Sequence, residues 1–175
     1  MAGVDVTSEY STLNLKNNLS DIKIDVLIHN AGIAETNSLE NLDVDSLRRQ
    51  FEVNALAPLV FTRKILGNLI KGSKVILISS RMGSIQDNTS GGSYGYRMSK
   101  AALCMAGKSL SIDLKPYEIS VALLHPGLVS TRMTGFTPHG ITTDQSVNGL
   151  LRKIDLLTME NSGSFWHSNG EPLPW

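Results

Sequence analysis

The stretch YRMSK, residues 96–100, places a phenol and an ammonium group four residues apart. On a helix, Tyr96 and Lys100 would lie on the same face, because residues four apart are surface neighbours. A free phenol titrates near pH ~10, too high for ready proton exchange at neutral pH. A neighbouring ammonium lowers that pKa, which would make Tyr96 a usable general acid or base. Tyr94 has only Met98 at the same offset, and the plain alternative for the pair is a solvent-exposed Tyr–Lys contact.

Ser80 is the candidate for a second polar group that would contact the substrate. It ends the apolar run KVILISS (74–80), so its hydroxyl should project from the carboxyl end of a strand, while Ser79 points to the other side. A hydroxyl there can donate a hydrogen bond to a carbonyl oxygen on which charge develops. The alternative is a serine that caps a loop.

Asn54 interrupts an otherwise apolar helical stripe. Pro58, four residues later, has no N–H to give to the Asn54 carbonyl, so we expect a kink that leaves this oxygen free to bind a water. Such a water could relay protons from Tyr96 past Lys100. The alternative is helix irregularity without a function.

Apolar periodicity predicts the elements that must position these residues. Short β-branched runs alternate with longer helical patterns, which favours βαβ units and a parallel sheet. The predicted strands are 24–30, 74–80, 119–126 and a weaker 163–168, and the predicted helices are 9–20, 43–70, 93–114 and 143–158.

Two of the predicted helices carry a buried stripe with steps of three and four residues. Pro116 should end the second of them shortly after its last apolar position. The first stripe is Leu47, Phe51, Asn54, Pro58, Phe61, Ile65 and Leu69, and the second is Leu103, Gly107, Leu110 and Leu114.

Three predicted strands end in small or polar residues, in HNAG, ISSRMG and HPGLVSTRM. Because ligands bind at the carboxyl ends of strands in open parallel sheets, the candidate chemistry should gather at one edge of the sheet. The glycine- and serine-rich piece 87–95 reads as a loop at the rim of this site.

Composition excludes several classes of protein. Sixteen basic residues balance sixteen acidic ones, so no net charge attracts nucleic acid or an anionic membrane, and no apolar run could span a bilayer. The single Cys104 reads as a packing residue, and with no visible signal peptide a reducing cytoplasm is the expected location. The four histidines lack the spacing of metal ligands, so we expect no metal site; they are His29, His125, His139 and His167.

HNAG, FEVNALAP, ISSRMG, YRMSK and HPGLVSTRM occur in the order and spacing of the short-chain dehydrogenase/reductase superfamily. The sequence around ISSRMGSI and YRMSKAAL resembles that of its small C-factor-like carbonyl reductase subgroup. The resemblance covers residues 4–175 and implies a single domain over 1–175 with a Rossmann-like, doubly wound parallel sheet. It implies a small-molecule carbonyl or alcohol as substrate and NAD or NADP as cofactor.

The resemblance also assigns roles to individual residues. Tyr96 would donate or accept the proton, Lys100 would lower its pKa and hold the nicotinamide ribose, Ser80 would orient the carbonyl, and Asn54 would complete a water relay. The loop 132–140 corresponds to a mobile substrate lid. Cofactor contacts would come, besides Tyr96 and Lys100, from Asp5, Val6, Asn30, Ala31, Gly32, Pro126, Gly127, Val129 and Thr131; the alternative for Pro126–Gly127 is an ordinary turn.

One part of the family pattern is not found in this sequence. The glycine-rich turn G-x-x-x-G-x-G, which holds the pyrophosphate at a helix N-terminus, does not occur, and the first two βα units of the family are absent. In the family's strand order the missing strands would flank 24–30, so we expect this strand to be an exposed apolar edge. The chain alone should then pair through this edge, bind a partner or be marginally stable. Members of the family often dimerise through the helices at 43–70 and 93–114, whereas some of the small carbonyl reductases are monomers.

Two hypotheses from different classes follow. The first is an NAD(P)-dependent carbonyl reductase or alcohol dehydrogenase, with Tyr96 as the acid/base. The second is a catalytically inactive fragment that acts as a binding or signalling module. A flavodoxin-like binding domain would explain the α/β pattern but would leave Tyr96, Lys100, Ser80 and Asn54 as coincidences.

Overall fold

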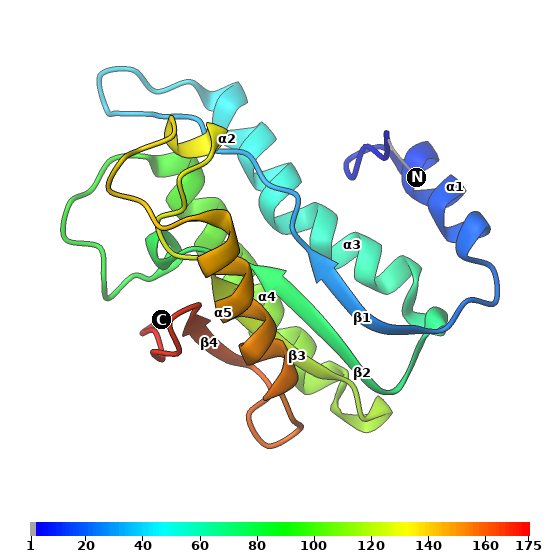
Figure 1. The fold of residues 1–175 in the computed structure, drawn as a ribbon. Helices are drawn as coiled ribbons and strands as arrows, with labels where there is room; N and C mark the ends of the chain where they lie inside the picture. Colours follow the sequence, from blue (N-terminus) through cyan, green and yellow to red (C-terminus); the bar gives the residue numbers. More distant parts are fainter. Residues whose placement is uncertain (1–2) are drawn as a thin grey trace.

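The computed structural model describes residues 3–175 and contains a sheet of four parallel strands in chain order (Figure 1). The strands are nearly continuous apolar runs, as expected where helices cover both faces of a sheet, and β3 is buried at five of its six positions. The predicted α/β class and parallel sheet are therefore confirmed. The strands are β1 (Ile24–His29), β2 (Leu69–Ile78), β3 (Ser120–His125) and β4 (Ser164–His167).

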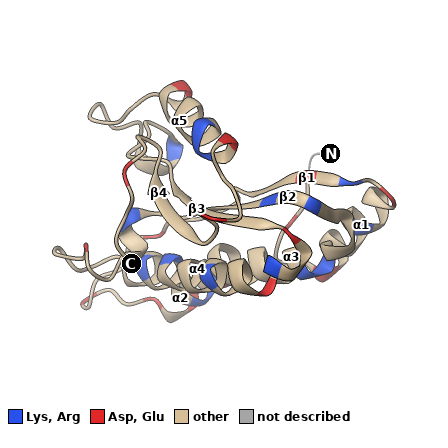
Figure 2. Ribbon diagram, turned by 90° about the horizontal axis from the view of Figure 1, so that it is seen from below, with Lys and Arg blue, Asp and Glu red and all other residues tan. Residues whose placement is uncertain are grey.

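The helices lie in two layers. Figure 2 shows α1 to α4 on one side of the sheet and α5 on the other, with basic and acidic residues interspersed along them. The alternation of β2 matches this, because Val75 and Leu77 pack in the cluster of α4 whereas Ile76 packs with Ile154 near the end of α5. The helices are α1 (Glu9–Leu19), α2 (Val44–Phe51), α3 (Ala57–Lys64), α4 (Tyr94–Asp113) and α5 (Thr143–Asp155).

The last two connections of the sheet have opposite hands. The strands are parallel and follow chain order, so β2–α4–β3 and β3–α5–β4 step across the sheet in the same direction. Since α4 and α5 lie on opposite faces, β2–α4–β3 has the usual right hand and β3–α5–β4 the rare left hand (Figures 1 and 2). In consequence, α5 covers the half of its face formed by the later strands.

Within residues 3–175, β1 forms one edge of the sheet and pairs only with β2. On the part of its face that α5 does not cover, the β1 side chains Val26 and Ile28 are 42% and 47% exposed. This is the exposed apolar edge expected from the sequence, and it is the kind of surface that pairs with another strand.

The predicted helix over 43–70 differs from the structure in two places. It ends at Lys64, and after a 3₁₀ turn the chain enters β2 at Leu69; the Asn68 amide in that turn donates to the carbonyls of Ser20 and Ile22 at 3.0 and 2.9 Å. The helix is also broken by a π-helical turn, η1 (Glu52–Leu56), where the Ala57 N–H bonds to the carbonyl five residues earlier.

The π turn changes which sequence positions are buried before it, compared with a regular α-helix. Before it, the buried side chains are Ser46 and Gln50, and Phe51 is 39% exposed, so the predicted stripe is wrong there. Beyond it, the stripe is correct at Pro58 and Ile65. Pro58 lies directly after the π turn, in the first turn of α3, and has no N–H to give to the carbonyls of the preceding turn. The stripe predicted for α4 is confirmed at all four positions.

No helix among the described residues combines the length and the apolar character needed to cross a membrane.

Two buried histidines predict acid sensitivity. Burial lowers the pKa of His29 from 6.5 to about 4, and its Nε2 bonds to the Thr62 hydroxyl at 2.7 Å. Between these pH values the unfolded chain binds the proton and the folded chain does not, so the free energy of unfolding falls as the pH is lowered through this window. Urea titrations from pH 7 to 4 should show a smaller fall for His29→Gln than for the wild type. Part of the fall should remain, because burial also lowers the pKa of His125 to about 3; identical pH profiles for the two proteins would contradict the assignment to His29.

Candidate active site

The predicted site residues lie at the carboxyl edge of the sheet. The segments that follow β1, β2 and β3 all leave the sheet at this edge, and α4 begins there (Figure 1). Ser80 follows β2, Tyr96 and Lys100 lie in the first turns of α4, and Asn54 reaches α4 from η1. The four candidate catalytic residues are therefore brought to one place from three elements.

Lys100 lies below the Tyr96 ring on α4, one helical turn along. Its ammonium nitrogen is 5.7 Å from the centre of the ring and donates a hydrogen bond to the Ile78 carbonyl at 2.8 Å. The Lys100 residue is only 4% exposed and Tyr96 is half-buried, so the pair is not a surface contact.

The pKa of Tyr96 shifts upward, opposite to the lowering predicted from the sequence. Burial raises this pKa above 10, and hydrogen bonding with Ser80 acts in the opposite direction. The ammonium of Lys100 does not reverse this, because it is directed to Ile78 and its own pKa is lowered by burial to about 8. In the free chain, dehydration of the phenol therefore outweighs the nearby cation.

Ser80 is held against α4 by the turn that follows it. Its hydroxyl accepts the Met82 N–H at 3.2 Å and caps the 3₁₀ turn η3 (Arg81–Gly83), so the loop-cap role is present as well. A Cβ on Gly83 would lie 2.7 Å from the carbonyl carbon of Lys100, so only glycine allows this close approach to α4. Ser79 points the other way, with its hydroxyl 3.2 Å from the buried Cys104 sulfur.

Asn54 joins the segment after β1 to α4 and is fully buried. Its amide nitrogen donates to the Ile33 carbonyl and to the Ser99 hydroxyl, and its amide oxygen accepts the Ile33 N–H, each at 2.9 Å. A Cβ on Gly32 would lie 3.2 Å from this amide oxygen and 3.6 Å from the Lys100 ammonium. The side chain of Asn54 therefore fixes the approach of Gly32 to Lys100, and the water relay through its main chain stays a prediction.

Part of the expected cofactor set shares one cavity. Val6, Asn30 and Ala31 line a cavity of about 120 Å³ together with apolar atoms of β1 and α3. Asp5 does not line it; its carboxylate accepts the Thr7 N–H and hydroxyl at 2.9 and 2.7 Å, and these bonds lower its pKa.

The other expected cofactor residues lie in the segment between β3 and α5. The Pro126 carbonyl accepts hydrogen bonds from the hydroxyls of Ser146 and Ser168 at 2.7 and 2.9 Å, and Gly127 has a φ of 88°. Val129 forms a bridge to Ile141, and Thr131 caps the 3₁₀ turn Arg132–Thr134. These contacts build the segment and do not reach Tyr96.

The described residues contain no group of three or more histidine, cysteine or acidic side chains placed to hold a metal ion.

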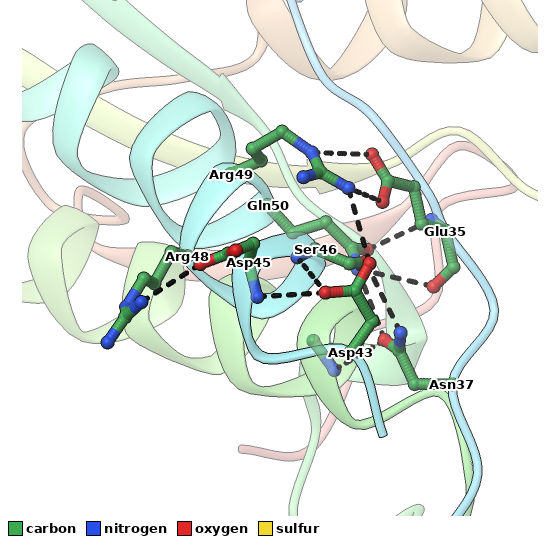
Figure 3. A network of polar contacts seen from close by, with 9 residues as sticks. Glu35, Asn37, Asp43, Asp45, Ser46, Arg48, Arg49 and Gln50 are labelled. Atoms are coloured by element: carbon green, nitrogen blue, oxygen red, sulfur yellow. Dashed lines mark hydrogen bonds and ion pairs between the residues drawn. The ribbon is translucent and has the colours of Figure 1, made fainter. Parts of the chain in front are cut away.

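Sequence reasoning missed two buried polar residues, Asn37 and Gln50, which are 3% and 0% exposed. Figure 3 shows them in a network between the segment after β1 and helix α2. The sequence feature that could have revealed them is a series of polar or small residues, spaced four apart, that runs through Asn54. All of its members are buried, and they are Ser46, Gln50, Asn54, Pro58 and Thr62.

Comparison with known proteins places the fold and these residues in context. A family model described as short chain dehydrogenase matches residues 1–141. The 1-hydroxy-2-glutathionyl-2-methyl-3-butene dehydrogenase of Rhodococcus sp. (strain AD45) is 46% identical and covers 99% of this chain and 79% of its own. C-signal of Myxococcus xanthus is 45% identical, over 87% of this chain and 93% of its own.

Solved structures agree with the sequence relatives. NADPH-bound carbonyl reductase from chicken fatty liver has a TM-score of 0.90 at 30% identity, over 98% of this chain and 75% of its own. Carbonyl reductase Sniffer of D. melanogaster has a TM-score of 0.88 at 31% identity, over 98% and 76%.

The burial of Lys100 predicts a stability gain when its charge is removed. Because its pKa is about 8 in the folded chain and 10.5 when unfolded, the unfolded state binds more protons between these values. The free energy of unfolding should therefore rise with pH across this window. Lys100→Met should lack the rise and be more stable near pH 7, by as much as about 3 kcal/mol. Urea titrations at several pH values measure this.

The matched control is Lys108→Met, which removes a solvent-exposed lysine from the same helix and should change stability little. A Lys100→Met variant that is less stable than the wild type near pH 7 would contradict the prediction.

Proposed function

Because the chain belongs to the short-chain dehydrogenase family, we propose that it is an NAD(P)-dependent oxidoreductase that interconverts a small carbonyl compound and its alcohol. The observation that carries the proposal is the buried group formed by Tyr96, Lys100 and Ser80, with Asn54 fixing the segment beside them. A chance Tyr–Lys pair would not bring a strand-end hydroxyl and a buried amide to the same helix turn. With its one cysteine buried and free, the protein fits a reducing cytoplasm.

Each residue has a part in the proton transfer. In carbonyl reduction, the Tyr96 hydroxyl donates its proton to the carbonyl oxygen, and in alcohol oxidation its phenolate accepts the proton. Ser80 donates a hydrogen bond that orients the carbonyl, and the Lys100 cation stabilises the phenolate. A raised Tyr96 pKa in the free chain keeps the phenol protonated, as the reductive direction requires.

The residues present fit the nicotinamide part of a dinucleotide. The Lys100 ammonium is buried and donates to the Ile78 carbonyl, which leaves further N–H groups for ribose hydroxyls next to Gly32. Val6, Asn30 and Ala31 line the adjoining cavity, and the Pro126–Thr131 segment would seat the nicotinamide amide. A bound nicotinamide would supply or accept the hydride. The pattern G-x-x-x-G-x-G does not occur within residues 3–175, so we assign no pyrophosphate contact.

A second candidate is a binding or signalling role that does not use catalysis. It is favoured by the 45% identity with C-signal, whose name describes a signal and of which the match covers 93%. The two candidates differ in cofactor binding. If neither NADH nor NADPH quenches Trp166 and Trp175 or raises the melting temperature, the oxidoreductase proposal fails for this chain.

Tyr96→Phe tests the acid/base role. Removing the hydroxyl should lower turnover by about 10²- to 10⁴-fold, since general acid–base catalysis contributes this much. Cofactor affinity should change little, because the ring and Lys100 remain. Turnover is measured as NAD(P)H oxidation with a panel of aldehydes and ketones.

Tyr94→Phe is the matched control, two residues away on the same helix, and should keep near-wild-type turnover. Equal turnover in the Tyr96→Phe variant and the wild type would overturn the assignment.

We also propose that the chain studied alone self-associates through the exposed edge at β1. Charged residues on an edge strand oppose pairing, so Val26→Lys and Ile28→Lys should shift the protein to the monomer in size-exclusion chromatography with light scattering. Phe51→Lys tests the alternative helix face, where Leu47, Phe51, Leu56 and Met98 surround an open hollow. A wild-type chain that is monomeric at all concentrations and melts cooperatively would contradict self-association.

A further inference from the structure

We propose that Asn37 and Gln50 are positioning residues for Tyr96, because together they cap the start of helix α4 from across the structure. The importance of this positioning for catalysis rests on the proposed function, whereas the contacts themselves do not depend on it. The side-chain hydrogen bonds of both residues go to groups other than the four candidate catalytic side chains, and both residues are almost completely buried.

Helix α4 begins without a cap of its own. The first N–H groups of a helix have no partner within the helix and need an acceptor from elsewhere. Ser93, at the N-cap position, has a left-handed backbone with a φ of 47°, and its side chain makes no capping bond. A local serine, threonine or aspartate would normally supply this acceptor.

Asn37 supplies the missing acceptors. Its main-chain carbonyl accepts the Ser93 N–H at 2.9 Å, and its side-chain oxygen accepts the Gly95 N–H at 3.3 Å, across 58 residues of chain. Tyr96 is the next residue after Gly95. The start of α4, and with it the position of Tyr96, therefore depends on where Asn37 is held.

Gln50 holds the Asn37 amide in one orientation. Its amide nitrogen donates to the Asn37 side-chain oxygen, to the Glu35 carbonyl and to the Ser46 hydroxyl, each at 3.2 Å. Its oxygen accepts the Glu35 N–H at 3.0 Å, and the Asn37 amide nitrogen donates to Ser46 at 3.2 Å (Figure 3). The Asn37 oxygen thus faces only donors, and a flip of the amide would break several bonds at once.

The segment that carries Asn37 is anchored to α2 at both ends. Arg49 pairs with Glu35 at 2.8 Å, and Asp43 caps α2 through the N–H groups of Asp45 and Ser46 at 2.9 and 3.1 Å (Figure 3). These contacts fix the segment 35–43 to helix α2, and α2 runs directly into η1, which carries Asn54.

Two ties then join this unit to α4, one on each side of Tyr96. The first is Asn37 to Gly95, and the second is Asn54 to Ser99 at 2.9 Å. Gly95 is required at the first tie, because a Cβ there would lie 2.5 Å from the Gln50 amide nitrogen and 3.0 Å from the Asn37 oxygen. The glycine between the two tyrosines of the sequence is explained by this contact.

The test compares two changes at Asn37. Asn37→Asp keeps an oxygen acceptor for Gly95 and for Gln50, whereas Asn37→Leu has a similar volume and no acceptor. We expect Asn37→Leu to lower kcat by about tenfold or more with little change in KM, because a small displacement of a catalytic group is costly. Asn37→Asp should retain kcat close to the wild-type value.

Two readouts separate positioning from general stability and do not need turnover. Hydrogen exchange should accelerate at the amides of Ser93 and Gly95 in Asn37→Leu but not in Asn37→Asp, with no acceleration near Gly107. Spectrophotometric titration, with Tyr96→Phe as the blank, should show the Tyr96 pKa moving in Asn37→Leu towards the ordinary ~10 as the helix start loosens. Arg48→Ala removes an exposed ion pair from α2 and should change neither readout.

The outcomes are distinct. Unchanged exchange at Gly95 in Asn37→Leu overturns the proposal, and so does equal behaviour of the Asp and Leu variants. If Asn37→Leu does not fold, Asn37→Ala is measured under the same criteria. If no turnover is found with either cofactor, the proposed function fails, while exchange and the Tyr96 titration still decide whether Asn37 and Gln50 position Tyr96.

Discussion

The hydrogen bond from the Lys100 ammonium to the Ile78 carbonyl joins helix α4 to the end of strand β2. It places a cation at the carboxyl edge of a parallel sheet, where burial is severe enough to lower the lysine pKa to about 8. The hydrogen bond to Ile78 offsets part of this unfavourable burial, and the chain packs closely around the lysine. The turn after Ser80 approaches the Lys100 backbone so closely that only glycine fits at residue 83, and from the β1 side Gly32 lies close to the Asn54 amide oxygen and the Lys100 ammonium. The position of the lysine thus determines which small residues must surround it.

A second constraint is the polar contact between α4 and the long helical unit α2–η1–α3. Helix pairs in soluble proteins commonly meet through apolar side chains, but here three of the four buried residues on α2 and η1 are polar, namely Ser46, Gln50 and Asn54. Buried amides need every partner satisfied, so this contact tolerates little variation in geometry. An apolar contact of the same size would let α4 slide or rotate by small amounts. A polar contact fixes the register of α4, which would suit the proposed role of Tyr96 as the proton donor.

Much of the architecture could be predicted from the sequence because its strongest signals are local. The apolar runs around Val75 and Val121 are strands whatever surrounds them, and Leu103, Gly107 and Leu110 mark one face of α4 unambiguously. Tyr96, Lys100 and Ser80 were predicted from spacing and strand ends. Phe51 and Gln50 could not be, since a hydrophobicity pattern assigns phenylalanine to the core and glutamine to the surface. The reverse arrangement arises from partners far along the chain. The predicted direction of the Tyr96 pKa shift was wrong for a similar reason. The spacing of residues reveals a nearby charge but does not reveal the loss of water around the phenol.

The π-helical turn at Glu52–Leu56 lets one continuous helix serve two different neighbours. The π turn takes up one extra residue within a single turn, so the buried positions before it lie one residue earlier in the sequence than a regular α-helix would place them. Before the turn the helix presents amides and hydroxyls to α4, and after it the buried side chains include Ile65 and the Thr62 hydroxyl that contacts His29 of the sheet. In evolutionary terms the turn is equivalent to a one-residue insertion. If the same residues formed a regular α-helix instead, Leu47 and Phe51 would face α4 in place of Ser46 and Gln50, and the polar contact with Asn37 would be lost.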